Sequence, residues 1–256
     1  MGRLLKATVL ANDQVLSGIY KLVLAQEWLA GEAKPGQFLN IRVSGASAPL
    51  LRRPLSIHYA TGNQVEVLFQ VVGEGTKLLS QVKPGEVLDV QGPLGNGFEL
   101  NGKGPAILVG GGMGIAPLVF LAARLREPIC LLGSRNGQLL SSSGGARLQE
   151  MGLELQIATD DGSLGRKGLV TELLEQTIDK AGRIYTCGPK VMLREVARLA
   201  IEHNIPCQVS LEEHMACGVG ACLGCVCQTK TVQGDKRHSR VCTDGPVFEA
   251  REVVWE

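Results

Sequence analysis

The sequence predicts a multidomain protein of β and α/β class: an antiparallel β-barrel, then a parallel-sheet α/β domain, then a small cysteine-rich domain. Short alternating strands occupy roughly the first hundred residues, and strands alternate with helices over about the next hundred. Five of the eight cysteines then fall between Cys217 and Cys242. We therefore expect three domains, at residues 1–100, 101–206 and 207–256.

The composition sets limits on partners and location. A net charge of +1 and an aromatic content of 4% argue against a nucleic-acid partner. The N-terminus lacks the apolar stretch of a secretory signal, and the apolar runs are too short to span a bilayer. We expect a cytoplasmic protein with no membrane partner. Its cysteines should form no disulfide framework, because that compartment is reducing.

Turn signals divide the first unit into short strands. Residues 65–72 and 86–90 contain alternating apolar and polar side chains, as in strands with one buried face. Lys-Pro-Gly turns end at Gly36 and Gly85, and such evenly spaced strands are typical of an antiparallel barrel. We also expect strands at 18–24 and 37–43, and a short helix at 76–81.

The pattern changes after Pro105. Residues 106–110 form a continuous apolar run, which is typical of a parallel strand buried on both faces. A βα alternation follows and predicts βαβ units, whereas the segment from Cys207 onward is expected to be loop-like. The remaining expected strands are 129–132, 153–159 and 183–186, and the expected helices are 117–126, 169–179 and 190–203.

The cysteine cluster has the spacing of a known kind of iron–sulfur site. Cys217, Cys222 and Cys225 follow a C-x4-C-x2-C pattern, and Cys242 stands later as a fourth thiol. This is the plant-type [2Fe–2S] spacing. The glycines between the cysteines let the loop wrap closely and point backbone N–H groups at the cluster sulfurs. We therefore expect the third unit to be a small iron–sulfur domain.

Two alternatives remain open for these cysteines. The first is a structural zinc site, in which His214 or His238 replaces a thiolate. The second is that Cys227 is a ligand in place of Cys225. In a strand these two side chains would point the same way, so only the spacing favours Cys225.

A glycine-rich loop connects the strand at 106–110 to the following helix. Its glycines let the backbone approach a pyrophosphate, and the helix N-terminus adds free N–H groups and partial positive charge. The loop departs from G-x-G-x-x-G because Ile115 stands at a glycine position, and no Walker pattern follows. A tight turn without a ligand is the alternative. The candidate residues are Gly110, Gly111, Gly112 and Gly114.

Two further glycine-bearing loops follow strands of the same unit. Cys187, Gly188 and Pro189 separate a strand from a helix, and residues 160–163 follow another strand. Each loop alone is equally well explained as a plain turn. Ligands of open α/β sheets, however, bind beyond the carboxyl ends of the strands. We therefore expect the three loops to converge on one crevice.

Two motifs in the first unit suit a second pyrophosphate. An arginine beside a hydroxyl, in the sequence R-P-L-S at 53–56, and an N–H-rich turn, in the sequence G-E-G-T at 73–76, can jointly hold phosphate oxygens. A surface charge and a strand hydroxyl are the alternative interpretation of the first motif.

Taken in order, these motifs resemble those of the ferredoxin–NADP reductase superfamily. The R-P-x-S strand, the G-x-G-T turn, the G-G-G-x-G-x-A-P loop and C-G-P occur in that family's order. The appended C-x4-C-x2-C-x16-C, with the segment at 241–248, is more closely similar to the electron-transfer subunits of class 1B dihydroorotate dehydrogenase. The resemblance spans roughly residues 3–254.

The resemblance implies three cofactors: FAD, a [2Fe–2S] cluster and NAD. The implied FAD contacts are Arg53, Pro54, Leu55, Ser56, Leu68, Phe69, Gln70, Gly75 and Thr76. The implied cluster ligands are Cys217, Cys222, Cys225 and Cys242. The implied nicotinamide nucleotide contacts are Gly110, Gly111, Gly112, Gly114, Cys187, Gly188 and Pro189. Two positions depart from the family: Leu55 replaces a frequent aromatic residue, and Gln70 stands where a basic residue would be unsurprising.

The resemblance also implies a partner and a reaction. An FMN-containing TIM-barrel subunit would oxidise dihydroorotate to orotate in pyrimidine biosynthesis, in a heterotetramer with two copies of each subunit. Electrons would pass through the cluster and FAD to NAD⁺, so this chain would be an oxidoreductase subunit without a catalytic acid–base residue of its own. The rivals are a subunit of an NAD(P)H-dependent ferredoxin or sulfide oxidoreductase, and a zinc-bearing module without a redox role.

The choice between NAD and NADP depends on the end of the strand at 129–132. That strand is followed by Gly133, Ser134 and Arg135, with no acidic residue to bind a ribose 2′-hydroxyl. Arg135 could accept a 2′-phosphate or could be a solvated charge. The family resemblance favours NAD, and we follow it.

Overall fold

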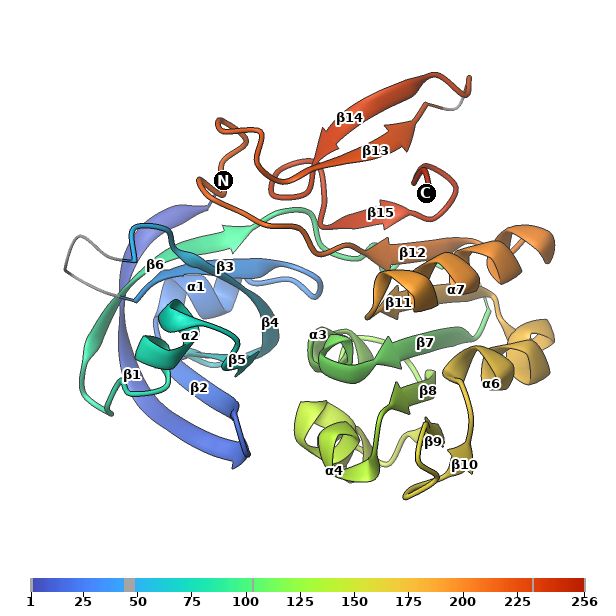
Figure 1. The fold of residues 1–256 in the computed structure, drawn as a ribbon, viewed down its shortest axis with the longest axis horizontal. Coiled ribbons are helices and arrows are strands. Elements are labelled where there is room, and N and C mark those ends of the chain that lie inside the picture. Colours follow the sequence, from blue (N-terminus) through green and yellow to red (C-terminus); the bar gives the residue numbers. More distant parts are fainter. Residues whose placement is uncertain (1, 44–48, 103, 232, 256) are drawn as a thin grey trace.

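The computed structural model describes residues 2–43, 49–102, 104–231 and 233–255. Figure 1 shows a barrel beside an α/β domain, with the cysteine-rich segment lying across one end of both. This arrangement confirms the expected fold class. In the described part of the chain, no helix is both long enough and apolar enough to cross a membrane.

The first unit is a closed six-stranded antiparallel barrel. Its strands are hydrogen-bonded in the order β1-β2-β5-β4-β3-β6. Fully buried aliphatic side chains such as Leu22, Leu39 and Val67 fill its interior. The strands are β1 (Arg3–Leu16), β2 (Ile19–Ala25), β3 (Phe38–Arg42), β4 (Arg53–Thr61), β5 (Gln64–Gln70) and β6 (Val87–Leu94), and the helices are α1 (Glu27–Glu32) and α2 (Glu74–Leu79).

Helix α2 begins two residues before the predicted start at 76. The hydroxyl of Thr76 accepts hydrogen bonds from the backbone N–H groups of Val72 and Gly73, at 2.9 and 3.2 Å. A hydroxyl in the first turn therefore caps the N–H groups that a helix leaves unsatisfied at its start. This capping fixes the turn at 73–76 against the end of β5.

The second unit is built on a seven-stranded sheet of order β10-β9-β8-β7-β11-β12-β15. Its strands are parallel except for β15, which pairs antiparallel with β12. The strands are β7 (Ala106–Gly111), β8 (Ile129–Ser134), β9 (Glu154–Thr159), β10 (Arg166–Lys167), β11 (Arg183–Cys187), β12 (Cys207–Ser210) and β15 (Val247–Glu249). The helices are α3 (Ile115–Ala122), α4 (Gly137–Leu140), α5 (Ala146–Glu150), α6 (Val170–Thr177) and α7 (Lys190–Glu202), with 3₁₀ turns at Gly112–Gly114 and Ile178–Lys180 and a π-helical turn at Ser141–Gly145.

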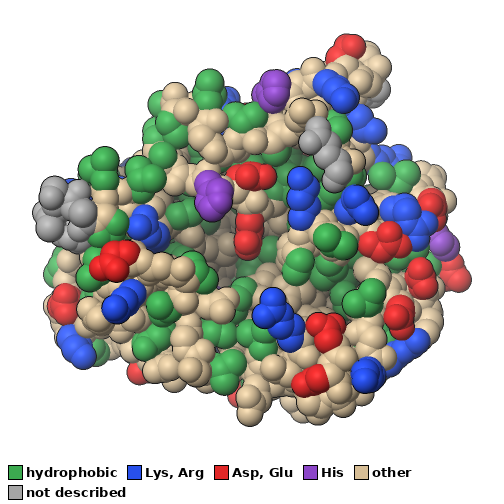
Figure 2. Space-filling view, viewed as in Figure 1, with side chains coloured by type: hydrophobic (Ala, Val, Ile, Leu, Met, Phe, Trp, Pro, Cys, Tyr) green, Lys and Arg blue, Asp and Glu red, His purple; other side chains and the backbone are tan. Residues whose placement is uncertain are grey.

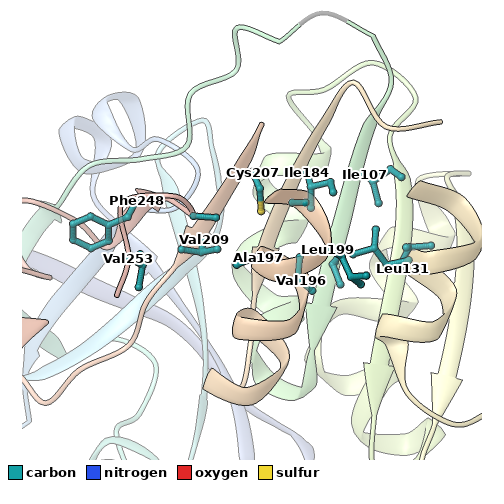
Figure 3. Close-up of a cluster of buried hydrophobic side chains, with 14 of the residues drawn as sticks. Ile107, Leu131, Ile184, Val196, Ala197, Leu199, Cys207, Val209, Phe248 and Val253 are labelled. Atoms are coloured by element: carbon teal, nitrogen blue, oxygen red, sulfur yellow. The ribbon is translucent and has the colours of Figure 1, made fainter. Parts of the chain in front are cut away.

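Both faces of this sheet are covered. On one face, Ile107, Leu131 and Ile184 pack against α7 and α6, and the same core continues to Phe248 of β15 (Figure 3). On the other face, side chains such as Leu108 lie against α3, α4 and α5. Strands buried on both faces carry continuous apolar runs, which explains why the sequence predicted them.

The cysteine-rich segment is more regular than predicted. We expected loops after Cys207, and that expectation is wrong for β12, β15 and the hairpin of β13 (Val226–Lys230) and β14 (Lys236–Arg240). All four residues of β12 are buried, and although Cys207–Ser210 alternate between apolar and polar, a run of only four residues is a weak strand signal. Residues 207–256 remain a proposed domain, and its first and last strands belong to the neighbouring sheet.

Buried polar contacts join the barrel to the α/β domain. His58 lies at an irregularity in the β4–β5 pairing, and its Nδ1 donates to the carbonyl oxygen of Ala116 in α3 at 2.8 Å. Burial lowers the pKa of His58 to about 4, so the imidazole is neutral near pH 7. Beside it, Arg147 pairs with Glu66 at 2.7 Å and lies over the ring of Tyr59. The His58 contact holds α3, and the glycine loop before it, against barrel strand β4, and the Arg147 contacts hold α5 against β4 and β5.

Candidate functional site

A cavity of about 1190 Å³ lies where the carboxyl ends of β7, β8, β9 and β11 meet. Figure 2 shows this face of the molecule, which is hollowed near its centre. Gln70 borders the cavity from the barrel, and Cys227 and His238 border it from the hairpin of the cysteine-rich segment. The cavity therefore touches all three proposed domains, and only its central part is the crevice expected from the sequence.

Two of the predicted glycine loops contact each other at the cavity wall. A Cβ added to Gly114 would lie 2.5 Å from the backbone carbon and oxygen of Cys187 and from the nitrogen of Gly188. A Cβ added to Gly188 would lie 3.0 Å from the Cα of Gly111. Glycine is required here because two backbones touch. Gly111, Gly112, Gly114, Gly188 and Pro189 all line the cavity.

The remaining two predicted residues of these loops lie behind this wall. Gly110 and Cys187 are buried at the ends of β7 and β11. Burial raises the pKa of the Cys187 thiol, so this side chain is a neutral core group. The N-termini of α7 and of the 3₁₀ turn that leads into α3 face the cavity, and this arrangement suits the phosphates of a dinucleotide.

The third expected loop, at 160–163, reaches the same wall through Asp160, whose carboxylate had no assigned role in the sequence analysis. Asp160 follows β9, and its N–H donates to the carbonyl oxygen of Ser134 at 3.1 Å. Ser134, Arg135 and Asp160 all line the cavity. The hydroxyl of Ser134 is buried and has no hydrogen-bond partner among the described residues. The sequence analysis looked for the residue that selects the coenzyme only at the end of β8, whereas the parallel pairing of β8 with β9 places the expected loop at 160–163 beside it.

Glu212 is a second cavity residue that the sequence analysis missed. It follows β12 and lines the cavity near the C-G-P loop. Partial burial raises the pKa of its carboxyl group. No sequence signal marked it, because β12 itself was not predicted.

The two predicted phosphate motifs of the barrel also meet. A Cβ added to Gly75 would overlap the guanidinium of Arg53, so this glycine lets the arginine lie directly on the backbone of the turn. Nη1 of Arg53 donates to the carbonyl oxygens of Leu51 and Arg52, and in the described part of the chain no carboxylate pairs with it. An uncompensated cation beside a capped N–H-rich turn fits a pyrophosphate.

The remaining predicted flavin contacts divide between two faces of the barrel wall. Ser56 lies opposite Phe38, and Pro54 lies opposite Asn40, on the outer face of the β3–β4 pair. Leu55 lies on the inner face and packs against the barrel core. Leu68 is buried, and the ring of Phe69 is stacked on Tyr20. The side chains of Leu55 and Phe69 are therefore occupied by these packing contacts, and mainly their backbone atoms are left to contact a flavin.

The four candidate cluster cysteines lie as two pairs. The N–H of Cys222 donates to the sulfur of Cys217 at 3.4 Å, and the N–H of Cys242 donates to the sulfur of Cys225 at 3.4 Å. In a [2Fe–2S] cluster each iron takes two protein ligands, so a two-by-two arrangement fits it. Among the described residues no group of three or more His, Cys, Asp or Glu side chains surrounds a single-ion position.

Backbone donors favour the thiolate at the first pair. Burial opposes ionisation of Cys217, but the N–H groups of Val219 and Cys222 donate to its sulfur and lower its pKa to about 6. The second pair is deeper, and burial raises the pKa of Cys242 to about 11. Cys227 lies on β13 opposite Ser239 and faces the large cavity.

An exposed apolar tip lies beside the first cysteine pair. Val219 is 53% exposed and Leu223 is 63% exposed. Leu223 also has a φ of 57°, a conformation that a leucine rarely adopts. Exposed aliphatic side chains held in an unfavourable backbone conformation fit a surface that another protein covers.

Comparisons with known proteins agree with this geometry. Residues 212–254 match a family model described as the iron–sulfur cluster binding domain of dihydroorotate dehydrogenase B. A protein of Caldanaerobacter subterraneus named dihydroorotate dehydrogenase B (NAD(+)), electron transfer subunit, is 42% identical over 253 residues, or 98% of each chain. A protein of Desulforamulus reducens with the same name is 42% identical over the whole of both chains. A solved structure of an NADH-dependent reduced ferredoxin-NADP oxidoreductase covers all of this chain and 92% of its own, with 30% identity and a TM-score of 0.85.

Proposed function

Because the chain belongs to the family of dihydroorotate dehydrogenase B electron transfer subunits, we propose that it carries electrons from a dihydroorotate-oxidising partner to NAD⁺. The observation that carries this proposal is the pairing of four thiols beside a flavin-type barrel and a dinucleotide-type cavity in one chain. A ferredoxin or sulfide oxidoreductase would share these parts. The relatives that are 42% identical favour the dihydroorotate partner.

Each proposed domain has one binding task. In residues 1–100, Arg53 and the turn at Gly75 hold the pyrophosphate of FAD, and the outer face of β4 supports its ring. In residues 101–206, the touching glycine loops hold the phosphates of NAD. In residues 207–256, Cys217 and Cys222 hold one iron, and Cys225 and Cys242 hold the other.

When bound, FAD and the cluster supply the redox chemistry, and the chain supplies position and electrostatics. Oxidation of dihydroorotate releases two electrons and two protons; NAD⁺ takes up both electrons and one proton as hydride, and the other proton goes to solvent. The glycine loops orient the nicotinamide nucleotide, and the contact of His58 with Ala116 keeps the loop before α3 in place against the barrel. No acid–base side chain of this chain is required.

The partner is proposed to be an FMN-containing catalytic subunit, in a complex with two copies of each chain. The exposed tip formed by Val219 and Leu223 is the proposed contact surface, since it lies beside the first cysteine pair. A surface patch of this kind is typical of protein–protein contacts. We place the complex in the cytoplasm, because none of the eight cysteines forms a disulfide, which suits a reducing compartment.

Reconstitution with the partner tests this function. Mixing the iron-, sulfide- and flavin-loaded chain with a dihydroorotate-oxidising flavoprotein subunit should give dihydroorotate-dependent reduction of NAD⁺ that neither protein shows alone. Leu223→Asn should weaken the complex about tenfold, because it removes an apolar contact while asparagine tolerates the local φ. Ile201→Asn, at an equally aliphatic exposed site on α7, is the matched control. A colourless, zinc-containing chain, or NAD⁺ reduction by the partner alone, would refute the proposal.

Coenzyme choice should depend on Asp160. Its carboxylate shares the cavity wall with Ser134 and Arg135, where it would bind a ribose 2′-hydroxyl and repel a 2′-phosphate. Asp160→Asn should therefore shift the ratio of kcat/KM for NADPH over NADH upward by about tenfold. The control is Asp179→Asn, which removes the same charge at an exposed site on the same domain. An unchanged ratio in Asp160→Asn would remove this residue from the explanation of coenzyme preference.

A further inference from the structure

Asn40 is a buried polar side chain without partners. It lies on β3 with none of its surface exposed, and neither Oδ1 nor Nδ2 has a hydrogen-bond partner among the described residues. A carboxamide offers two N–H donors and one acceptor oxygen. Burying such a group unpaired is destabilising, so an orphan of this kind calls for a partner outside the protein chain.

The pleat of β3 shows where this side chain points. Leu39 and Ile41, its neighbours in the strand, belong to the barrel core, so Asn40 points to the outer face. It lies directly opposite Pro54 and shares that face with Ser56. The carboxamide is therefore on the wall that supports the proposed flavin.

The cluster loop covers the same side chain. A Cβ added to Gly218, the residue after Cys217, would lie 2.8 Å from Nδ2 of Asn40 and 3.5 Å from Oε1 of Gln91. Gly218 has a φ of 69°, so a close approach and a left-handed conformation both require glycine. The side-chain amide of Asn40 thus lies between the barrel strands β3 and β4 and the loop that begins at Cys217.

Other groups near Asn40 already contact the candidate cluster cysteines. Phe38, which also points to the outer face of β3, packs in one core with Cys225 and Cys242. Backbone N–H groups donate to the sulfurs of Cys217, Cys222 and Cys225, whereas no side-chain N–H donor to them is present among the described hydrogen bonds. A buried amide beside them is the kind of outer donor that sets the potential of an iron–sulfur cluster.

We propose that Asn40 contacts the iron–sulfur cluster directly: its side-chain N–H donates to a cluster sulfur beside Cys217 and raises the reduction potential of the cluster. The proposal rests on the proposed function, because it needs the cluster. A hydrogen bond to sulfur favours the reduced, more negative state, so loss of this donor lowers the reduction potential.

The test compares two variants of the loaded chain. Asn40→Leu removes the donor without adding charge, because it replaces the orphan by an apolar group of similar size, which a buried site accepts. Asn40→Asp keeps the shape and replaces the N–H donor by a carboxylate oxygen, whose negative charge also opposes reduction. Both should bind FAD and keep iron and sulfide. In both, the cluster's equilibrium constant for reduction should fall about tenfold, a shift of about 59 mV for one electron, and its EPR spectrum should change. The potential is measured by titration followed by EPR.

The control makes the same exchange at another barrel asparagine. Nδ2 of Asn12 donates to the carbonyl oxygens of Leu79 and Val82, so Asn12→Asp should cost thermal stability and leave the cluster potential unchanged. An unchanged potential and EPR spectrum in both Asn40 variants would overturn the proposal. Absence of iron and sulfide from the wild-type chain would instead overturn the proposed function itself, so the two failures are distinguishable.

Discussion

Cys222→Ala should abolish the [2Fe–2S] cluster and reduce dihydroorotate-dependent NAD⁺ reduction by the complex on the order of a hundredfold or more. The sulfur of Cys222 forms one pair with that of Cys217 on an exposed loop, and no other thiol lies at that position to replace it within the described chain. Oxidation of NADH by an artificial acceptor should survive, because the cavity and the Arg53 motif lie elsewhere. Iron and sulfide counts and both activities check the result.

Cys227→Ala is the matched control for this variant. Its thiol lies two residues beyond Cys225, but it borders the large cavity. Iron and sulfide should remain at wild-type levels in Cys227→Ala. If this variant lost the cluster and Cys222→Ala kept it, the assignment of ligands by spacing would be wrong. In Cys222→Ala, an equal loss of dihydroorotate-dependent NAD⁺ reduction and of NADH oxidation by an artificial acceptor would contradict the proposal that only the first activity needs the cluster.

Gly114→Ala should raise the KM for NADH by about ten- to a hundredfold. The added Cβ would lie 2.5 Å from backbone atoms of Cys187 and Gly188, and backbone cannot move aside as a flexible side chain can. The two loops that are proposed to hold the nucleotide would separate, and a displacement of about 1 Å at such a site is enough for an effect of this size. The free energy of unfolding should fall by about 1–3 kcal/mol, as for other overpacked sites.

Steady-state kinetics with NADH and thermal melting check the Gly114 prediction. Gly31→Ala is its control, because nothing lies within 4 Å of a Cβ at that position in α1. FAD and iron content should be normal in both variants. A normal KM in a correctly folded Gly114→Ala variant would show that contact between the two loops does not position the nucleotide.

Local patterns predicted the parts of the fold that depend on neighbours in sequence. The alternating strands of the barrel and the apolar runs of the parallel sheet follow from which faces are buried. Cysteine spacing and glycine loops are equally local, so the candidate ligands could be named residue by residue. Strand β12 was missed because its alternation, from Cys207 to Ser210, lasts for only four residues, which is a weak strand signal.

Long-range pairing explains most of what the sequence did not show. The loop at 160–163 was expected at the crevice, but the place of the Asp160 carboxylate beside Ser134 depends on the pairing of β9 with β8. Glu212 reaches the same wall only because β12 lies beside β11. Asn40 gave no signal either, since a single asparagine in a strand gains meaning only when the loop at Gly218 lies on it. Tertiary contacts bring these residues to the candidate site, and a local sequence motif does not reveal such contacts.

The pairing of β15 with β12 limits how easily the iron–sulfur segment can be removed from this protein or transferred to another. Because the strands that flank the cysteine loop both belong to the nucleotide-binding sheet, the iron–sulfur segment is not a detachable cassette. Excision from Cys207 onward would leave β11 as a bare edge, with a row of unpaired N–H and C=O groups open to other chains. A design that transfers this cluster to another reductase would therefore have to include the adjoining sheet. Without that sheet, we expect the protein to aggregate through the exposed strand edge.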